Sequence, residues 1–380
     1  MGSKPDHFAE SGAGCTIPEV MHIRIVMRLR GDFRQFKAGR GACMVAAQLA
    51  NGESGMKKMM LACALTLCAS TAMSAGIVSI APGIDLIPGE FVPNQQPDGN
   101  SLVFRTPTGL VVVDSGRHAA HTQRILDYAH QANLPIKAII NSHWHLDHIG
   151  GNPRIRAAYP EVQIFASAAI DDAMHGFLAD YRKQLEDAIA QAKDASKAQP
   201  WRDEIAIIDA GHALYPDLII DKTQTRRIAD RDFVLHLESH AVTAGDVWVF
   251  EPQTHVLAAG DLVTLPVPFL DTACPAHWKI ALDDLAHADF KTLVPGHGAP
   301  MSRAQFETYR KAYDNLYTCA ASSKDKNICI DGWLANAKPL LGDTDPHFVK
   351  SLVDYYVDNS LRAPRAKLDK LCGAAPATAS

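Results

Sequence analysis

The sequence has no cluster of lysine and arginine residues, and its formal net charge is −5. Removing residues 1–75, which we expect the mature protein to lack, takes away nine basic and five acidic residues and leaves 28 basic against 37 acidic residues, a charge of −9. Such an acidic protein lacks the positive surface that polyanions require, so nucleic acid is not an expected partner. Sequence repeats of solenoid period are also missing, and low complexity is confined to the tail GAAPATAS, for which we predict disorder.

We predict no stable membrane span in the mature form. Before it, the apolar run from Met59 to about Cys68 is too short to cross a bilayer. It follows two lysines and precedes small residues, which is the order of a secretory signal peptide that begins at Met56. We therefore predict a signal peptide over residues 56–75, with cleavage near Ala75 or, less favoured, Ala72, and a periplasmic or secreted protein. Residues 1–55 are then an upstream extension from a wrongly chosen start; the alternative is a buried apolar helix that joins two segments.

Cysteine is scarce, with eight in 380 residues, and four of the eight precede the predicted cleavage point. The even number that remains suits an oxidising compartment. These are Cys274, Cys319, Cys329 and Cys372. Cys319 and Cys329 flank the polar stretch SSKDKN, which favours a local disulfide, with four free thiols as the alternative.

The mature chain alternates strand and helix patterns. Residues 101–116 read as two β-rich runs joined by a turn, 118–132 as a helix, and 137–143 as a buried strand running into a loop. Helix-favouring sequence occupies about 168–215. Further strands are predicted at 232–239, 246–252, 255–263 and 291–295, a helix at about 277–288, and amphipathic helices after residue 301. The pattern is typical of an α/β sandwich.

The stretch NSHWHLDHIGGN, residues 141–152, concentrates histidine at the end of the third of these strands. His143 and His145 are two residues apart, so on an extended or tightly turned backbone they point the same way. Asp147 and His148 follow in a turn that two glycines permit. Two imidazoles can bind one metal ion while the carboxylate and the next imidazole bind a second ion close by. Zn²⁺ accepts such a mixed set of nitrogen and oxygen ligands. The alternative, histidines that are merely hydrogen-bonded in a loop, does not account for this spacing.

Two metal ions need more ligands than these four residues supply. Asp261 ends the apolar strand of HVLAAGDLV, and His297 follows the strand TLVP in PGHG. Each lies just past a strand, as the histidine-rich stretch does, and we expect all of them to converge on one cleft.

These motifs resemble those of the metallo-β-lactamase superfamily, over about residues 77–300. NSHWHLDHIGGN matches the HxHxDH motif of that family, AAGDLV its bridging aspartate, PGHG its last metal histidine, and VVVDSG its early strand. The resemblance implies an α/β (α+β) fold, a four-layer αββα sandwich. It places a catalytic domain at 76–300 with a helical insertion at about 168–215, followed by a helical extension at 301–380.

The resemblance also implies two Zn²⁺ ions per chain, with iron or manganese as alternatives. The first ion would be bound by His143 and His145, the second by Asp147, His148 and His297, and both by Asp261. One position departs from the family pattern, because Val242 stands where a third histidine for the first ion is usual. We predict that His240, two residues earlier, takes that role, with His236 as the fallback. Supporting positions are Asp114, Gly150 and Gly151.

Two cations that share one water lower its pKa and polarise the substrate, which predicts hydrolysis of an ester, thioester, lactone, amide or phosphoester. Asp147 would orient the hydroxide. A β-lactamase is the alternative, favoured by export but disfavoured by Asp261, where such enzymes usually carry cysteine or serine. A second alternative is a metal-binding interaction domain without turnover.

We expect a small-molecule substrate, and the sequence predicts no particular oligomeric state. The insertion should place a helix face either over the cleft or in the core, comprising Met174, Phe177, Leu178 and Tyr181. Candidate substrate contacts are Tyr181, Trp201 and Tyr215.

Overall fold

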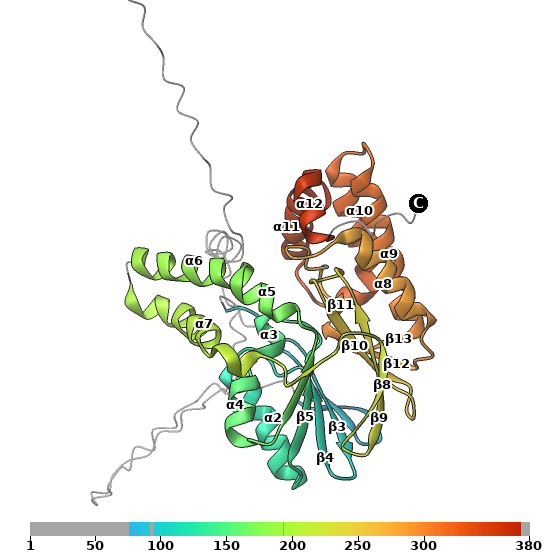
Figure 1. Cartoon of the computed structure of the whole chain (residues 1–380). Helices are drawn as coiled ribbons and strands as arrows, with labels where there is room; N and C mark the ends of the chain where they lie inside the picture. The colour runs from blue at the N-terminus through green and yellow to red at the C-terminus, as the bar shows by residue number, and fades with distance from the viewer. Residues whose placement is uncertain (1–75, 92–94, 193, 374–380) are drawn as a thin grey trace, which may run out of the picture.

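The structure is a computed structural model that describes residues 76–91, 95–192 and 194–373. The predicted signal peptide, the extension before it and the end of the Ala-rich tail lie outside these residues. Two β-sheets pack face to face, and helices cover both outer faces (Figure 1). The predicted four-layer αββα order is confirmed.

The first sheet has seven strands in sequence order. Its first four strands run antiparallel, and the last three add in parallel. The fourth strand, GLVVV, is buried along its whole length, which suits its β-branched residues. The strands are β1 (Val78–Ala81), β2 (Ile84–Ile87), β3 (Ser101–Thr106), β4 (Gly109–Val113), β5 (Ile136–Ile140), β6 (Gln163–Ala166) and β7 (Leu218–Ile219).

The second sheet has six strands in the order β13-β12-β11-β10-β9-β8. All neighbours are antiparallel except β11 and β12, which are parallel. The carboxyl ends of β11 and β12 therefore lie at one edge, where they face the end of β5. The strands are β8 (Gln224–Ile228), β9 (Arg231–Glu238), β10 (Asp246–Glu251), β11 (Val256–Thr264), β12 (Thr292–His297) and β13 (Met301–Ser302).

Three apolar layers hold the sandwich together. The central layer packs the two sheets against each other, with Phe104 edge-on to Phe233 at 5.1 Å between ring centroids. Outside the first sheet, α2 (Ala119–Ala132) and α4 (Asn152–Ala158) bury Ile125 and Ile155. Outside the second sheet, a larger layer includes Trp278. The helices of that layer are α8 (Pro275–His287), α9 (Arg303–Ala321), α10 (Lys326–Leu341), α11 (Pro346–Tyr356) and the one-turn η4 (Val357–Leu361).

The predicted helical insertion lies between β6 and β7. It folds as helices that pack on the α3 turn (Leu146–Ile149) through a fourth apolar cluster that includes Trp144. The helix-favouring sequence is interrupted at Gly176, which is the N-cap of the longest helix of the insertion. The elements are α5 (Ala169–His175), α6 (Phe177–Gln191), η2 (Ala195–Ala198), α7 (Gln199–Asp209) and η3 (Gly211–Leu214).

Two disulfides fasten the C-terminal helices. Cys319 and Cys329 are joined, which confirms the predicted local disulfide. A second disulfide joins Cys274 and Cys372 across 98 residues. It ties the end of α12 (Arg365–Leu371) to the start of α8, beside the loop that follows β11.

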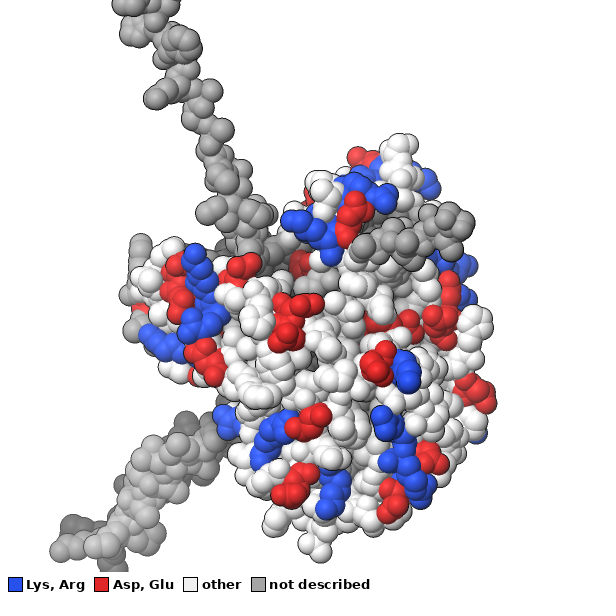
Figure 2. Space-filling model, in the orientation of Figure 1, with Lys and Arg blue, Asp and Glu red and all other residues white. Residues whose placement is uncertain are grey.

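None of the helices in the described ranges is long and apolar enough to cross a membrane. On the face of the molecule shown in Figure 2, acidic and basic side chains are interspersed, and no large area of one sign is visible.

The two disulfides should differ in their contribution to stability. In the chain-entropy model, closing a loop of roughly 100 residues is worth about 4.7 kcal/mol, and closing one of about 10 residues about 2.7 kcal/mol. We expect Cys274→Ala/Cys372→Ala to lower the free energy of unfolding by more than the matched pair Cys319→Ala/Cys329→Ala, as measured by guanidinium denaturation. An equal loss of unfolding free energy in the two double variants, or a larger loss in Cys319→Ala/Cys329→Ala, would contradict this prediction.

Candidate metal centre

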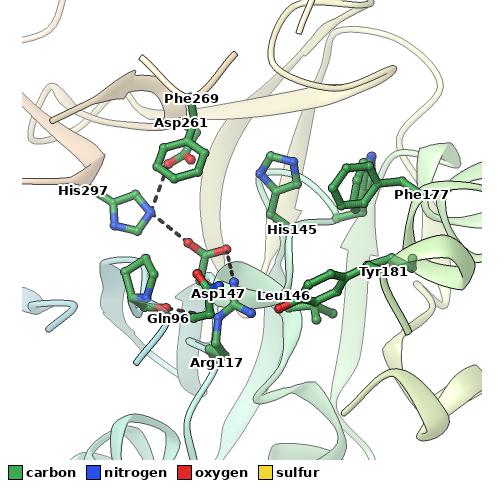
Figure 3. Close-up of a pocket in the computed structure, with 13 residues that line it drawn as sticks. Gln96, Arg117, His145, Leu146, Asp147, Phe177, Tyr181, Asp261, Phe269 and His297 are labelled. Carbon is green, nitrogen blue, oxygen red and sulfur yellow. Dashed lines mark hydrogen bonds and ion pairs between the residues drawn. The ribbon is translucent and has the colours of Figure 1, made fainter. Parts of the chain in front are cut away.

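Six of the seven predicted metal ligands converge at one edge of the sandwich. His143 and His145 follow β5, and Asp147 and His148 lie in the α3 turn. Asp261 and His297 come from β11 and β12. Figure 3 shows four of the six, His145, Asp147, Asp261 and His297, around one cavity.

The strand β11 reaches the site through an irregularity. Its register against β12 shifts at Gly260, whose φ of 53° is in the left-handed region that glycine tolerates. A Cβ there would lie 2.5 Å from the Cβ of Ser142, so no larger residue fits between β11 and the histidine-rich loop. The shift places Asp261 at the centre of the site.

Asp147, His148 and His297 form one ligand group. The distance from Asp147 Oδ2 to His297 Nε2 is 2.9 Å, and to His148 Nε2 it is 3.6 Å. Oδ1 of Asp261 lies 3.3 Å from His148 Nε2 and 3.6 Å from His297 Nε2, so it completes this group as a fourth donor.

His143, His145 and Asp261 form the other ligand group. The nitrogens His143 Nε2 and His145 Nδ1 are 2.9 Å apart. Oδ2 of Asp261 lies 3.8 Å from His143 Nε2. Because its two oxygens face different groups, Asp261 is placed to bridge them.

Two buried atoms show that the group of Asp147, His148 and His297, together with Asp261 Oδ1, fits a bound cation. His148 Nε2 and Asp261 Oδ1 have no hydrogen-bond partner and are shielded from solvent. An unsatisfied buried polar atom is costly, and lone pairs that converge from nitrogen and carboxylate donors are what Zn²⁺ and similar ions bind. The other group has donors of the same kinds, two imidazole nitrogens and a carboxylate oxygen, so the two groups together suit two divalent metal ions.

Asp114 fixes the orientation of two of the imidazoles, one directly and one through Ser142. Its Oδ2 accepts from His148 Nδ1 at 2.8 Å and from the Ser142 hydroxyl at 2.6 Å. Because Ser142 Oγ donates to Asp114, it can accept from His143 Nδ1, 2.9 Å away. Both imidazoles are thus fixed with Nε2 directed at the site, as is common for metal-ligating histidines.

Thr272 plays the same part for His145. Its hydroxyl donates to the Val242 carbonyl at 2.9 Å and lies 2.9 Å from His145 Nε2. The Nε2 proton of His145 is therefore accepted by Thr272, which leaves Nδ1 as the metal donor.

The imidazole pKa values differ between the two groups. Burial lowers the pKa of His143 and His145 well below the usual value, so both rings are neutral. Burial opposes the charged form of His148 as well, but Asp261, Asp114 and Asp147 raise its pKa well above the usual value. These carboxylates make the surroundings of His148 favourable for a cation.

Arg117 links the metal centre to the helical insertion. Its guanidinium donates to Asp147 Oδ1 at 3.2 Å and to Glu204 Oε2, on α7, at 2.5 Å. Tyr181 donates to the same Glu204 oxygen at 3.4 Å. Burial raises the pKa of Asp147, but His148, His297 and Arg117 lower it well below the usual value, so the carboxylate is charged.

The two predicted supporting glycines lie in the turn after α3. The Gly150 amide donates to the Leu146 carbonyl, and the Gly151 amide donates to the Gly116 carbonyl. A Cβ on Gly151 would lie 2.2 Å from the Ser115 carbonyl oxygen. The close approach brings the β4 end and the ligand turn together.

The structure does not bring His240 to the site, contrary to the prediction for the first ion. Its Nδ1 donates to the Leu371 carbonyl of α12 at 3.1 Å, and its φ is 58°. The tail that accepts this bond is held in place by the Cys274–Cys372 disulfide. The fallback His236 is also engaged elsewhere, because it stacks on Trp248 with ring centroids 3.5 Å apart.

The cavity beside the ligands has mainly apolar walls. Of the three candidate substrate contacts, Tyr181 lines this cavity, whereas Trp201 lines a neighbouring cavity of about 550 Å³. Tyr215 lines neither cavity, and its hydroxyl donates to Asp171. The apolar and aromatic residues around the ligands are Pro97, Trp144, Leu146, Phe177, Leu178, Tyr181 and Phe269.

Three residues at this site were not predicted from the sequence. Ser142 directly precedes His143 and Arg117 follows the β4 end, so their adjacency to the motifs was the available signal. Thr272 contacts His145 across 127 residues, and nothing in its surrounding sequence marks it.

The comparisons with known proteins agree with this geometry. The family model described as the metallo-beta-lactamase superfamily matches residues 96–297. A linear primary-alkylsulfatase from Pseudomonas sp. (strain ATCC 19151) is 25% identical over 225 residues, 53% of this chain and 41% of that protein. A hydroxyacylglutathione hydrolase from Prochlorococcus marinus (strain MIT 9312) is 39% identical over 59 residues, 16% of this chain and 22% of that protein.

Among solved structures, the stereoselective inverting sec-alkylsulfatase Pisa1 from Pseudomonas sp. matches with a TM-score of 0.51 and 19% identity. The match covers 76% of this chain and 49% of that structure. The chain thus spans less than half the length of each of these three proteins, and the structural match supports the fold alone.

We expect Arg117→Met to destabilise the metal-free protein by about 3–5 kcal/mol, because it leaves the buried carboxylates of Asp147 and Glu204 without their common partner. The double variant Arg117→Met/Glu204→Gln should recover part of that loss, since one buried charge is then removed. Urea unfolding in the presence of a chelator measures both. A loss below about 1 kcal/mol, or a double variant no more stable than the single one, contradicts this role.

Proposed function

Because the chain belongs to the metallo-β-lactamase superfamily, we propose that it is a hydrolase that binds two divalent cations and cleaves a small substrate next to an apolar group. The observation that carries the proposal is the convergence of two ligand groups, which share Asp261, on one cavity with apolar walls.

The ligand set suits two Zn²⁺ ions. When bound, such cations lower the pKa of a shared water and polarise the oxygen of the bond that is cleaved. His143, His145 and Asp261 would hold one ion, and Asp147, His148, His297 and Asp261 the other.

The protein's own residues fix the geometry of the reaction. Arg117 binds Asp147 Oδ1, which leaves Oδ2, 2.9 Å from His297 Nε2, on the side of the ligand groups, where the shared water would be held. Asp147 is therefore the residue we assign to orient that water. Asp114 and Thr272 hold the imidazole tautomers, so no reorganisation is needed when the substrate arrives.

The cavity walls indicate how a substrate is recognised. Of the described residues that line it, Arg117 alone is a lysine or arginine, and its charge is balanced by Asp147 and Glu204. Phe177, Phe269 and Trp144 offer apolar contact instead. We infer that the substrate is an ester, thioester, lactone or amide with an apolar substituent.

We also propose that the protein is exported. Two disulfides support this, because such bonds persist mainly in oxidising compartments.

Activity should rise with the apolar content of the substrate. Each buried methylene is worth about 0.8 kcal/mol, so kcat/KM for a series of linear acyl esters should rise up to about fourfold per added methylene until the cavity is filled. Steady-state kinetics of the zinc-loaded protein measures this series.

Two variants serve as controls for the series. Phe177→Ala should flatten the dependence on chain length, whereas Asp261→Asn should abolish turnover of every member. A protein that binds zinc fully and hydrolyses none of the esters, thioesters, lactones, phosphodiesters or cephalosporins would instead support a metal-binding interaction domain. Turnover of the cephalosporin alone would support the β-lactamase alternative.

Hydrolysis of an alkyl sulfate is the second candidate. It is favoured by the 25% identity to the linear primary-alkylsulfatase and by the apolar walls of the cavity. Dodecyl sulfate and a carboxylic ester of the same alkyl length separate the candidates, since release of inorganic sulfate occurs only with the first. We expect the ester to have the higher kcat/KM, because the lining offers no uncompensated Arg or Lys for a sulfate group.

A further inference from the structure

We propose that the two metal positions bind their ions with unequal strength. The ion held by Asp147, His148, His297 and Asp261 is bound tightly, and the ion held by His143, His145 and Asp261 is exchangeable. The inference rests on the proposed function only in requiring that both groups bind metal.

The first reason is the number of donors. In the tight position there are four donors, and four of the separations between them are 2.9, 3.3, 3.6 and 3.6 Å. Donors at the corners of a tetrahedron around Zn²⁺, with bonds of about 2.0–2.2 Å, are roughly 3.3–3.6 Å apart. These separations therefore fit four protein donors around one ion with little adjustment.

The exchangeable position has one donor fewer. In the part of the chain that the structure describes, its group contains His143, His145 and Asp261. Three protein donors leave at least one coordination position for water or substrate, as in catalytic zinc sites, whereas four protein donors are typical of structural sites.

The residues that might have supplied the fourth donor are committed elsewhere. Val242 is fully buried and has an apolar side chain, and its carbonyl accepts the Thr272 hydroxyl. His240 donates to the Leu371 carbonyl. A Cβ on Gly373 would lie 2.8 Å from His240 Nε2, so the other ring nitrogen faces Gly373, just after α12.

Charge favours the same order. The tight position has two carboxylates, Asp147 and Asp261, and the exchangeable position has Asp261 alone. A divalent ion in the tight position is therefore more nearly neutralised by its own ligands. Loss of an outer partner of a ligand already costs roughly 10–100-fold in metal affinity, so we expect the missing donor to weaken the exchangeable ion by at least about 100-fold.

The experiment is zinc binding to the full, oxidised chain. After zinc loading and passage over a metal-free desalting column, we expect about one zinc per chain by plasma mass spectrometry. Calorimetric titration of the metal-free protein with Zn²⁺ should then show two affinities at least about 100-fold apart. Two ions of equal affinity, or no retained ion, would overturn the proposal.

Variants identify which position retains its ion. His145→Ala should keep one zinc through the column, whereas His297→Ala should keep clearly less than one, with His297→Gln as a second variant should the first not fold. His240→Ala is the matched control and should change neither affinity. The reverse pattern for His145 and His297, or a weaker second affinity in His240→Ala, would contradict the assignment.

Zinc content and activity are independent readouts. A chain with two unequal affinities that hydrolyses no substrate refutes the proposed function and leaves this inference standing. A chain with equal affinities that hydrolyses esters refutes this inference alone.

Discussion

The shared carboxylate of Asp261 is the contact on which the centre depends. Its Oδ1 faces His148 and His297, and its Oδ2 faces His143. Asp261 belongs to the second sheet, whereas the histidine-rich loop follows a strand of the first, so the two sheets must pack in one fixed register for both ligand groups to form. The apolar layer between the sheets sets that register, and the irregularity at Gly260 brings the carboxylate to the metal ligands.

Buried charge is balanced across the site in a single network. Asp114 and Asp147 accept from imidazoles and from Arg117, and Glu204 of the insertion balances the remainder of the guanidinium charge. The insertion consequently does more than cover the cleft. One of its helices contributes a carboxylate whose removal would alter the electrostatic surroundings of Asp147, a candidate metal ligand.

The sequence predicted most of the sandwich, and six of the seven candidate ligands lie together in the structure, because each is within or close behind the end of a strand with a clear apolar pattern. Short or polar strands were not predicted. The strand β7 has two residues and β8 has the sequence QTRRI, and neither shows an apolar alternation. His240 was misplaced because its partner, Leu371, lies 131 residues away, and no local pattern reports that contact. Thr272 was missed for the same reason.

The Cys274–Cys372 disulfide and the His240–Leu371 hydrogen bond join the rim of the metal centre to the last helix of the described chain. During synthesis, the histidine-rich loop emerges from the ribosome more than two hundred residues before that helix does. The contact between the start of α8 and the end of α12 can therefore form only after Cys372 has been synthesised, and its disulfide forms only where thiols can oxidise.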